Sequence, residues 1–186
     1  MFPAGIDKFR SVFVKEKVFV IGGCRSGKSS YAVKLAEGFA GDRKIYIATA
    51  TPGDDEMRQR IKQHQKERSK NWTTIEEPVL LSEAINENSQ KAGVILVDCL
   101  TLWVSNLFLQ QNDEVKISGD IKRLTQSIES APCPLIFVSN EVGSGIVPEN
   151  RLSRLFRDSI GFANQNVAAC CNSVIIMVAG IAVKIK

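Results

Sequence analysis

The chain has 186 residues, of which 44% are hydrophobic and 24% are charged, and its formal net charge is +4. This is the size and composition of one globular domain with a single core. The small basic excess argues against nucleic-acid binding, and the longest apolar run, 174–183, is too short to cross a membrane. Five cysteines without a C-x-x-C pair indicate free thiols in a reducing compartment, so we expect a cytoplasmic protein.

The predicted elements alternate between short apolar strands and longer amphipathic helices. Residues 1–16 have no clear pattern and are interpreted as an N-terminal extension, and one domain is predicted over 17–186. Continuous apolar runs predict strands buried on both faces at 18–21, 45–47, 94–97, 135–138 and 174–178. The segments between them predict helices at about 28–39, 54–69, 79–89, 113–130 and 149–170.

The C-terminus breaks this alternation. Only two residues separate 174–178 from a second apolar run, 181–185, which is too short a connection for a helical crossover. A hairpin fits, and it adds one antiparallel edge strand. The whole pattern predicts an α/β fold, a mostly parallel sheet with helices on both faces and an antiparallel C-terminal edge strand.

A glycine-rich loop follows the first predicted strand and opens the next helix. It reads G-G-C-R-S-G-K-S, the complete P-loop pattern, which predicts a P-loop NTPase of the RecA-like type. Backbone N–H groups of such a loop bind phosphate oxygens, the lysine contacts the β- and γ-phosphates, and the final serine binds Mg²⁺. The predicted phosphate-binding residues are Gly22, Gly23, Cys24, Arg25, Ser26, Gly27, Lys28 and Ser29.

Asp98 is the second part of the predicted nucleotide site. It ends the strand 94–97, and four apolar residues followed by an acid are typical of the carboxylate that holds Mg²⁺ in P-loop enzymes. The other interpretation is a carboxylate that caps a strand end. Together with the P-loop, the pattern favours Ser29 and Asp98 as the magnesium ligands.

His64 is the only histidine, and it lies in the highly charged segment 54–68. At helical spacing it shares a face with Met57 and Ile61, beside an apolar stripe. One interpretation is a residue at the boundary between core and solvent. The other is a neutral imidazole that attacks phosphorus, because histidine is nucleophilic near neutral pH. Spacing alone leaves both open.

Several motifs occur in a fixed order along the chain. They are Gly22–Ser29, Tyr46–Thr49, Asp54–Met57 with Arg60, Ile61 and His64, Trp72 with Glu76–Pro78, Asp98–Trp103 with Asn106 and Leu107, and Asn140–Asn150. From about residue 18 to 186 the chain resembles the bifunctional adenosylcobinamide kinase / adenosylcobinamide-phosphate guanylyltransferase family of cobalamin biosynthesis. It departs from the family at Cys24, where alanine is usual.

The resemblance implies two reactions on a corrinoid substrate. A nucleoside triphosphate, ATP or GTP, phosphorylates adenosylcobinamide, and GTP then transfers GMP to that phosphate through a guanylyl-histidine. It implies His64 and Lys28 as catalytic residues, Mg²⁺ as cofactor and a homo-oligomer, for which we expect a trimer. The further GTP contacts that it implies are Ala48, Thr49, Ala50, Gln65, Lys66, Glu67, Arg68, Glu76 and Asp98. The alternative is a plain small-molecule P-loop kinase in which His64 is a surface residue.

Two assignments stay open within this resemblance. The carboxylate of Glu76 suits the N1–H and N2 amino edge of guanine, which adenine lacks. The segment Asn140–Asn150 follows the strand 135–138 and so reaches the carboxyl edge of the sheet, where ligands bind in open α/β folds. It is either a structural turn with a helix start or a contact to substrate or to another subunit.

Overall fold

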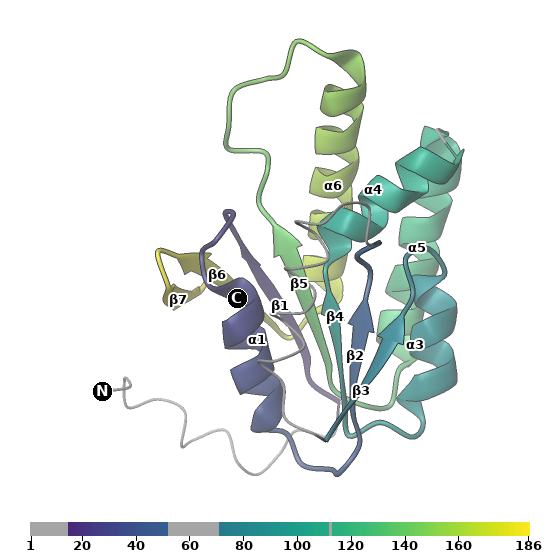
Figure 1. Ribbon diagram of the computed structural model, residues 1–186, viewed down its shortest axis with the longest axis vertical. Coiled ribbons are helices and arrows are strands. Elements are labelled where there is room, and N and C mark those ends of the chain that lie inside the picture. The colour runs from purple at the N-terminus through teal and green to yellow at the C-terminus, as the bar shows by residue number, and fades with distance from the viewer. Residues whose placement is uncertain (1–14, 52–70, 112) are drawn as a thin grey trace.

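The computed structural model describes residues 15–51, 71–111 and 113–186, which form a seven-stranded sheet with helices on both faces (Figure 1). Most of the predicted N-terminal extension and the predicted helix 54–69 lie outside the described residues. No helix in these three ranges is both long and apolar enough to cross a membrane.

The sheet contains every strand that the apolar runs predict, with bounds that differ by one or two residues. These are β1 (Lys17–Gly22), β2 (Lys44–Ala48), β4 (Val94–Asp98), β5 (Leu135–Asn140), β6 (Ser173–Val178) and β7 (Ile181–Lys184). One strand, β3 (Trp72–Glu76), was not predicted from an apolar run. Its side chains are exposed or half-buried because it forms the edge of the sheet, so it lacks the apolar run of a central strand.

The strand order is β3-β2-β4-β5-β1-β6-β7, and every pair is parallel except the β6–β7 hairpin. The prediction of a mostly parallel sheet with an antiparallel C-terminal edge is confirmed. In this order β5 separates β1, which leads into the glycine-rich loop, from β4, which ends at Asp98. All six parallel strands direct their carboxyl ends to the same edge of the sheet.

Four predicted helices are present: α1 (Lys28–Glu37), α3 (Leu81–Ser89), α5 (Glu114–Ser130) and α6 (Arg151–Cys170). The last two begin at 114 and 151 rather than at 113 and 149. The side chains of Asp113 and Asn150 accept backbone N–H groups two and three residues ahead, so these two residues are the N-caps.

The helix α4 (Leu100–Gln111) was not predicted. Apolar Leu102 and Leu109 lie on the face opposite its buried residues, so the sequence shows little amphipathic contrast. The buried residues are Leu100, Thr101, Trp103, Val104, Leu107 and Phe108. Through this buried face the helix packs against α5, α6 and β5.

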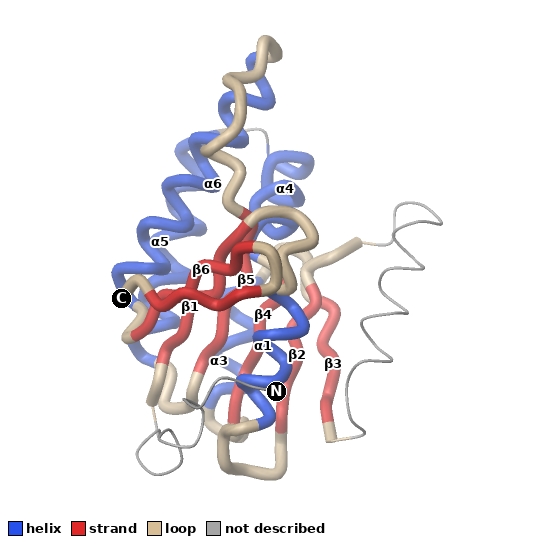
Figure 2. The backbone as a smooth tube through the Cα atoms, turned by 90° about the vertical axis from the view of Figure 1, so that its left-hand side faces the viewer, coloured by secondary structure: helices blue, strands red, loops and turns tan. Residues whose placement is uncertain are grey.

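Alternate residues of each strand build two separate parts of the core. Val18 and Val20 of β1 pack with Ala32 and Ala36 of α1 on one face of the sheet. Phe19 of the same strand packs with α3, α4, α5 and α6 on the opposite face. Figure 2 shows α1 on one side of the sheet and the other helices across from it. The fold therefore places the start of α1 and Asp98 at one edge of a rigid sheet.

A candidate nucleotide-binding site

The loop between β1 and α1 has the backbone shape that the glycine-rich pattern predicts. Gly27 has φ +91° and Arg25 has φ +55°, both in the left-handed region. The N–H of Ser26 donates to the carbonyl oxygen of Gly23 at 3.3 Å, which closes a tight turn. This turn brings the chain from the end of β1 directly into the first turn of α1.

The N-terminus of α1 differs from those of α5 and α6. The caps Asp113 and Asn150 occupy the free N–H groups of α5 and α6, whereas Gly27 is the N-cap of α1 and has no side chain to do so. The first turn of α1 also contains no acidic residue. The free N–H groups and the positive end of the helix dipole therefore remain available for an anion such as phosphate.

Two other segments fix the position of this loop, the residue after β5 and the stretch from β6 into the β6–β7 turn. The N–H of Glu141, just after β5, donates to the oxygen of Gly22 at 3.0 Å, and the N–H of Gly180 in the β6–β7 turn donates to the oxygen of Ser26 at 3.1 Å. A Cβ on Gly22 would lie only 2.4 Å from the carbonyl oxygen of Met177. The loop is thus held by backbone atoms of both segments, and Gly22 is required by space.

Lys28 is the buried cation of the loop, whereas Arg25 is exposed. Nζ of Lys28 donates to the carbonyl oxygen of Gly23 at 2.5 Å and lies 3.5 Å from Oγ of Ser26. Burial lowers the pKa of Lys28, and the nearby Cys99, Asp98 and Cys24 oppose that shift. A bound phosphate would add negative charge and favour the ammonium form, so Lys28 suits an anionic ligand.

Asp98 ends β4 on the same face of the sheet as α1, and it is half-buried. The hydroxyl of the buried Tyr46 donates to its Oδ2 at 2.9 Å, which fixes the orientation of the carboxylate. Ser29 lies in the first turn of α1 and adds a hydroxyl. Hydroxyl and carboxylate oxygens are hard ligands that fit Mg²⁺, which normally takes its remaining ligands from water and phosphate.

Three strand ends bring further predicted residues into one row. In the parallel register Ala48 lies opposite Glu76 on one side and opposite Asp98 on the other. The Glu76 side chain is exposed. The structure therefore brings together Ala48, Glu76 and Asp98 at one edge of the sheet, and Ala50 follows two residues after β2.

Thr49 also lies at this edge, but its side chain points inward. It is fully buried, and its Oγ1 accepts from the N–H of Cys99 at 2.8 Å and donates to the oxygen of Cys99 at 2.7 Å. In this geometry the hydroxyl ties the end of β2 to the residue after Asp98. Burial raises the pKa of Cys99 to about 12, so this neighbouring thiol stays protonated at neutral pH.

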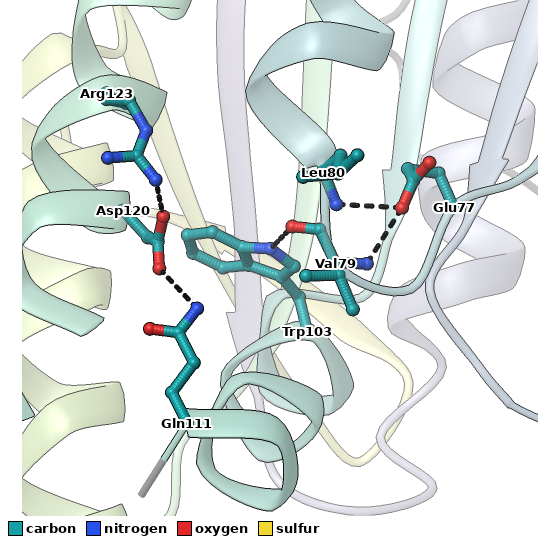
Figure 3. A network of polar contacts seen from close by, with 7 residues as sticks. All are labelled: Glu77, Val79, Leu80, Trp103, Gln111, Asp120 and Arg123. Atoms are coloured by element: carbon teal, nitrogen blue, oxygen red, sulfur yellow. Dashed lines mark hydrogen bonds and ion pairs between the residues drawn. The ribbon is translucent and has the colours of Figure 1, made fainter. Parts of the chain in front are cut away.

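The loop that follows Glu76 is held from two directions, as Figure 3 shows. Oε1 of Glu77 accepts the N–H groups of Val79 at 2.9 Å and Leu80 at 2.7 Å, and Nε1 of Trp103 donates to the oxygen of Val79 at 2.8 Å. A hollow of about 700 Å³ lies beside this loop. It is lined by residues of α3, α4 and α5 and not by the phosphate loop.

Part of the predicted site lies in the segment between β2 and β3. His64 and the stretch Gln65, Lys66, Glu67 and Arg68 lie outside the described residues. Trp103 is almost fully buried and belongs to the core.

Two side chains at the site were not assigned a role from the sequence. Tyr46 reaches Asp98, and Asn106 donates to the carbonyl oxygens of Thr49 and Pro78. The signal for Tyr46 was its position two residues before Ala48 in β2, which places both residues on the α1 face. No pattern in the sequence points to the partners of Asn106, because they are backbone atoms of two other segments.

The fold and this edge of the sheet define a P-loop nucleotide-binding protein. A prototypical ATPase of the type III secretion system of pathogenic bacteria has the same fold, with a TM-score of 0.59 and 12% identity. The match covers 92% of this chain, which spans 57% of that protein's length. The RadB recombinase is similar, with a TM-score of 0.50, 13% identity and coverage of 88% of this chain and 74% of that one.

Sequence comparison identifies the particular family. The chain matches the family model described as "Cobinamide kinase / cobinamide phosphate guanyltransferase" over residues 18–185, and it belongs to this family. It is 40% identical to the bifunctional adenosylcobalamin biosynthesis protein CobP of Pseudomonas aeruginosa, over 90% of this chain and 95% of CobP. It is also 40% identical to the corresponding Escherichia coli protein, CobU, over 91% of this chain and 99% of CobU.

Proposed function

We propose that a single nucleotide site on this chain serves both reactions of the family. As a member of the family, the protein is a cobinamide kinase and a cobinamide phosphate guanyltransferase of cobalamin biosynthesis. Both reactions begin with a nucleoside triphosphate whose phosphates need a shared set of positive groups. The observation that carries the proposal is the uncapped start of α1, with buried Lys28 beside it and Asp98 on the same face of the sheet.

In the kinase reaction, the hydroxyl oxygen of the corrinoid attacks the γ-phosphorus of ATP or GTP. The bond from that phosphorus to the β–γ bridging oxygen breaks, the diphosphate leaves, and the hydroxyl proton is lost to solvent. Phosphoryl transfer depends mainly on positioning and on neutralising charge. The N–H groups at the start of α1 and the ammonium of Lys28 supply that charge.

Ser29 and Asp98 are the residues that would hold Mg²⁺ in both reactions. The ion supplies positive charge to the phosphate oxygens when it is bound. Tyr46 holds Asp98 in a fixed orientation through its hydroxyl, so the carboxylate does not have to be ordered when the nucleotide arrives.

In the guanylyl transfer, a ring nitrogen of His64 attacks the α-phosphorus of GTP. A nitrogen–phosphorus bond forms, the bond to the α–β bridging oxygen breaks, and pyrophosphate leaves. The phosphate of the corrinoid substrate then attacks the same phosphorus, which yields the corrinoid-GDP product and releases the imidazole. Gln65, Lys66, Glu67 and Arg68 follow His64 directly, and we assign them to contacts with the same GTP.

The choice of GTP for this second step is assigned to Glu76. Guanine presents its N1–H and its N2 amino group on one edge, and a carboxylate can accept from both. Support comes from the exposure of Glu76 and from its register with Ala48 and Asp98. Ala48, Thr49 and Ala50 are assigned to the adjoining wall of the nucleotide site, where Thr49 contributes through its backbone.

We also propose that the chain assembles as a homo-oligomer, with a trimer as the expected form. Support comes from apolar side chains that are exposed in two regions, Ile146 and Val147 in the β5–α6 loop and Ile181 and Ile185 near the C-terminus. Light scattering on a size-exclusion column tests this assembly, and a mass of one chain would contradict it.

The experiment that tests the covalent step uses GTP labelled at the α-phosphate with ³²P. The wild type and His64→Ala are incubated with this GTP and Mg²⁺, denatured, and counted. We expect acid-labile, alkali-stable label on the wild type and none on His64→Ala, because a phosphorus–nitrogen bond has that stability. Absence of label on a wild type that binds GTP would overturn the covalent step and favour a plain kinase.

Two controls make the result specific. GTP labelled at the γ-phosphate should leave no label on the wild type, because that phosphate departs in pyrophosphate. His64→Ala should still phosphorylate the corrinoid, because the kinase reaction does not use the imidazole.

A further inference from the structure

Asn106 of α4 joins two loops that are distant from it in the sequence. Its Nδ2 donates to the carbonyl oxygen of Thr49 at 2.8 Å and to the carbonyl oxygen of Pro78 at 3.0 Å. The first acceptor lies just after β2 and the second lies just after β3. One amide group therefore uses both of its protons to fix the separation of two strand ends.

The ends of β2 and β3 carry the residues that are assigned to the guanine base of GTP. Glu76 is the last residue of β3, and the N–H of Glu77 donates to the oxygen of Ala48 at 2.9 Å. The amide of Asn106 binds the carbonyl oxygens of Thr49 and Pro78, the residues that directly follow Ala48 and Glu77. A change at Asn106 would therefore shift the backbone that carries Glu76 relative to the backbone of β2.

The rest of the loop has little freedom to compensate. Glu77 accepts the N–H groups of Val79 and Leu80, and Trp103 binds the oxygen of Val79 (Figure 3). The carboxylate of Glu76 makes no hydrogen bond to any residue in the described part of the chain. Its position is thus set by the backbone, and the backbone is set by side chains of α4.

We propose that Asn106 is a positioning residue for nucleobase selection, acting by holding Glu76 where it can accept both donors of the guanine edge. The inference rests on the proposed assignment of Glu76 to guanine. Two simultaneous hydrogen bonds tolerate displacements of only about 0.5 Å, so a small shift of the loop weakens guanine binding. Adenine has no such pair of donors, and the phosphates are held elsewhere, so ATP binding depends little on Asn106.

The test compares Asn106→Asp with the wild type by calorimetric titration with the non-hydrolysable analogues GMPPNP and AMPPNP. Aspartate keeps the shape of the side chain but has no proton to donate to the two carbonyl oxygens. We expect the affinity ratio of the guanine to the adenine analogue to fall about tenfold, with AMPPNP affinity nearly unchanged. An equal loss of affinity for both analogues would overturn the inference and leave Asn106 a purely structural residue.

A double variant separates this inference from the assignment on which it depends. In a Glu76→Gln background, Asn106→Asp should leave the affinity ratio unchanged, because its effect acts through the Glu76 carboxylate. A further fall of the ratio in that background would overturn the inference. If Glu76→Gln alone keeps the wild-type ratio, the assignment of guanine recognition to Glu76 fails. If Glu76→Gln lowers the ratio and Asn106→Asp does not, only the role of Asn106 fails.

Two further variants test whether the change in the affinity ratio is specific to the loop after Glu76. Asn88→Asp removes an amide of the same kind, which donates to the oxygen of Ala84 within α3, and it should keep the wild-type ratio. Trp103→Phe removes the N–H that binds Val79 but keeps an aromatic ring in the core, and it perturbs the same loop. It should also lower the ratio, so the proposal remains testable if Asn106→Asp does not fold, and an unchanged ratio there would count against it.

Discussion

The two halves of the nucleotide site are held in place by different kinds of atoms. Backbone groups of two distant segments hold the phosphate loop, one at Glu141 after β5 and one that includes Met177 of β6 and Gly180 of the following turn. Side chains hold the edge that includes Thr49 and the loop after Glu76, namely the Thr49 hydroxyl, the Asn106 amide and the Trp103 indole. The first half is assigned to the phosphates, which all nucleoside triphosphates share, and the second is assigned to the base, which differs among them.

This difference predicts which substitutions each half tolerates. A backbone contact survives most changes of side chain but fails when a Cβ occupies the space of the approaching strand. A side-chain contact survives small changes of volume but fails when one donor is removed. Phosphate binding should therefore be sensitive to added atoms, and the half of the site held by side chains should be sensitive to the loss of single polar groups.

The largest effect is expected for Gly22→Ala. The new Cβ would lie 2.4 Å from the carbonyl oxygen of Met177, so β1 and β6 must separate. We expect a loss of about 3 kcal/mol in the free energy of unfolding, the upper end of the range for overpacking. Urea denaturation measures this loss. Gly23→Ala is the matched control, since a Cβ there has no neighbour within 4 Å in the described structure, and an equal loss in both variants would contradict the steric explanation.

Thr49→Val tests the half held by side chains. Valine has nearly the same shape but leaves the N–H of Cys99 without its partner, beside a side chain with no solvent access, whereas the carbonyl oxygen of Cys99 still accepts from the N–H of Trp103. We expect a loss of about 2 kcal/mol in the free energy of unfolding. Thr125→Val serves for comparison, because its hydroxyl binds only Lys122 at an exposed position, and its stability should stay within about 0.5 kcal/mol of the wild type.

Tyr46→Phe tests the residue that orients Asp98. Phenylalanine keeps the ring, which packs edge-on against Trp72 at 6.2 Å, and removes the hydroxyl that donates to Oδ2. We expect Mg²⁺ affinity in the presence of GMPPNP to fall about tenfold, as for other residues that orient a metal ligand. Mn²⁺ binding followed by electron paramagnetic resonance measures it independently of turnover. The only other tyrosine, Tyr31, provides the control Tyr31→Phe, and equal losses in both would refute the role of Tyr46.

The smallest effect is a dependence of stability on pH. Burial lowers the pKa of both Lys28 and Lys17, so between the folded value and 10.5 the unfolded chain binds more protons. Stability contributed by each lysine therefore rises with pH in that window, with a slope of at most about 1.4 kcal/mol per pH unit. The measurement compares the wild type with Lys28→Met and with Lys17→Met by denaturation between pH 8 and 10.5.

Nucleotide distinguishes these two lysines. Phosphates beside Lys28 favour its charged form, so GMPPNP should weaken the slope that Lys28→Met removes. Lys17 binds the carbonyl oxygens of Ala131 and Cys133 instead, and its slope should not change. An equal response of both lysines to GMPPNP would contradict the placement of the phosphates at Lys28.

Continuous apolar runs predicted the central strands because burial on both faces leaves no other composition. The same reasoning failed for β3, whose Thr73 and Thr74 are exposed at the sheet edge, and for α4, whose apolar residues are not confined to its buried face. Both elements became visible only through tertiary packing, which local periodicity does not encode.

The residues of the site also differ in whether the sequence could predict them. The P-loop and Asp98 were predictable because their chemistry depends on residues that lie close together in the chain and directly after strands. Asn106 was not, because its two acceptors are carbonyl oxygens of Thr49 and Pro78, and any residue type can supply a carbonyl. The inward orientation of Thr49 was equally hidden, since it depends on the backbone of Cys99.

The contacts around Gly22 and Ser26 have a consequence for synthesis on the ribosome. The loop is synthesised well before Glu141, Met177 and Gly180, the residues that fix its position. A nascent chain released before residue 180 would lack the hydrogen bond from Gly180 to Ser26. A chain that ends before residue 180 therefore lacks part of the frame that holds the phosphate loop, and nucleotide should protect it from proteases less than it protects a chain that contains all three residues.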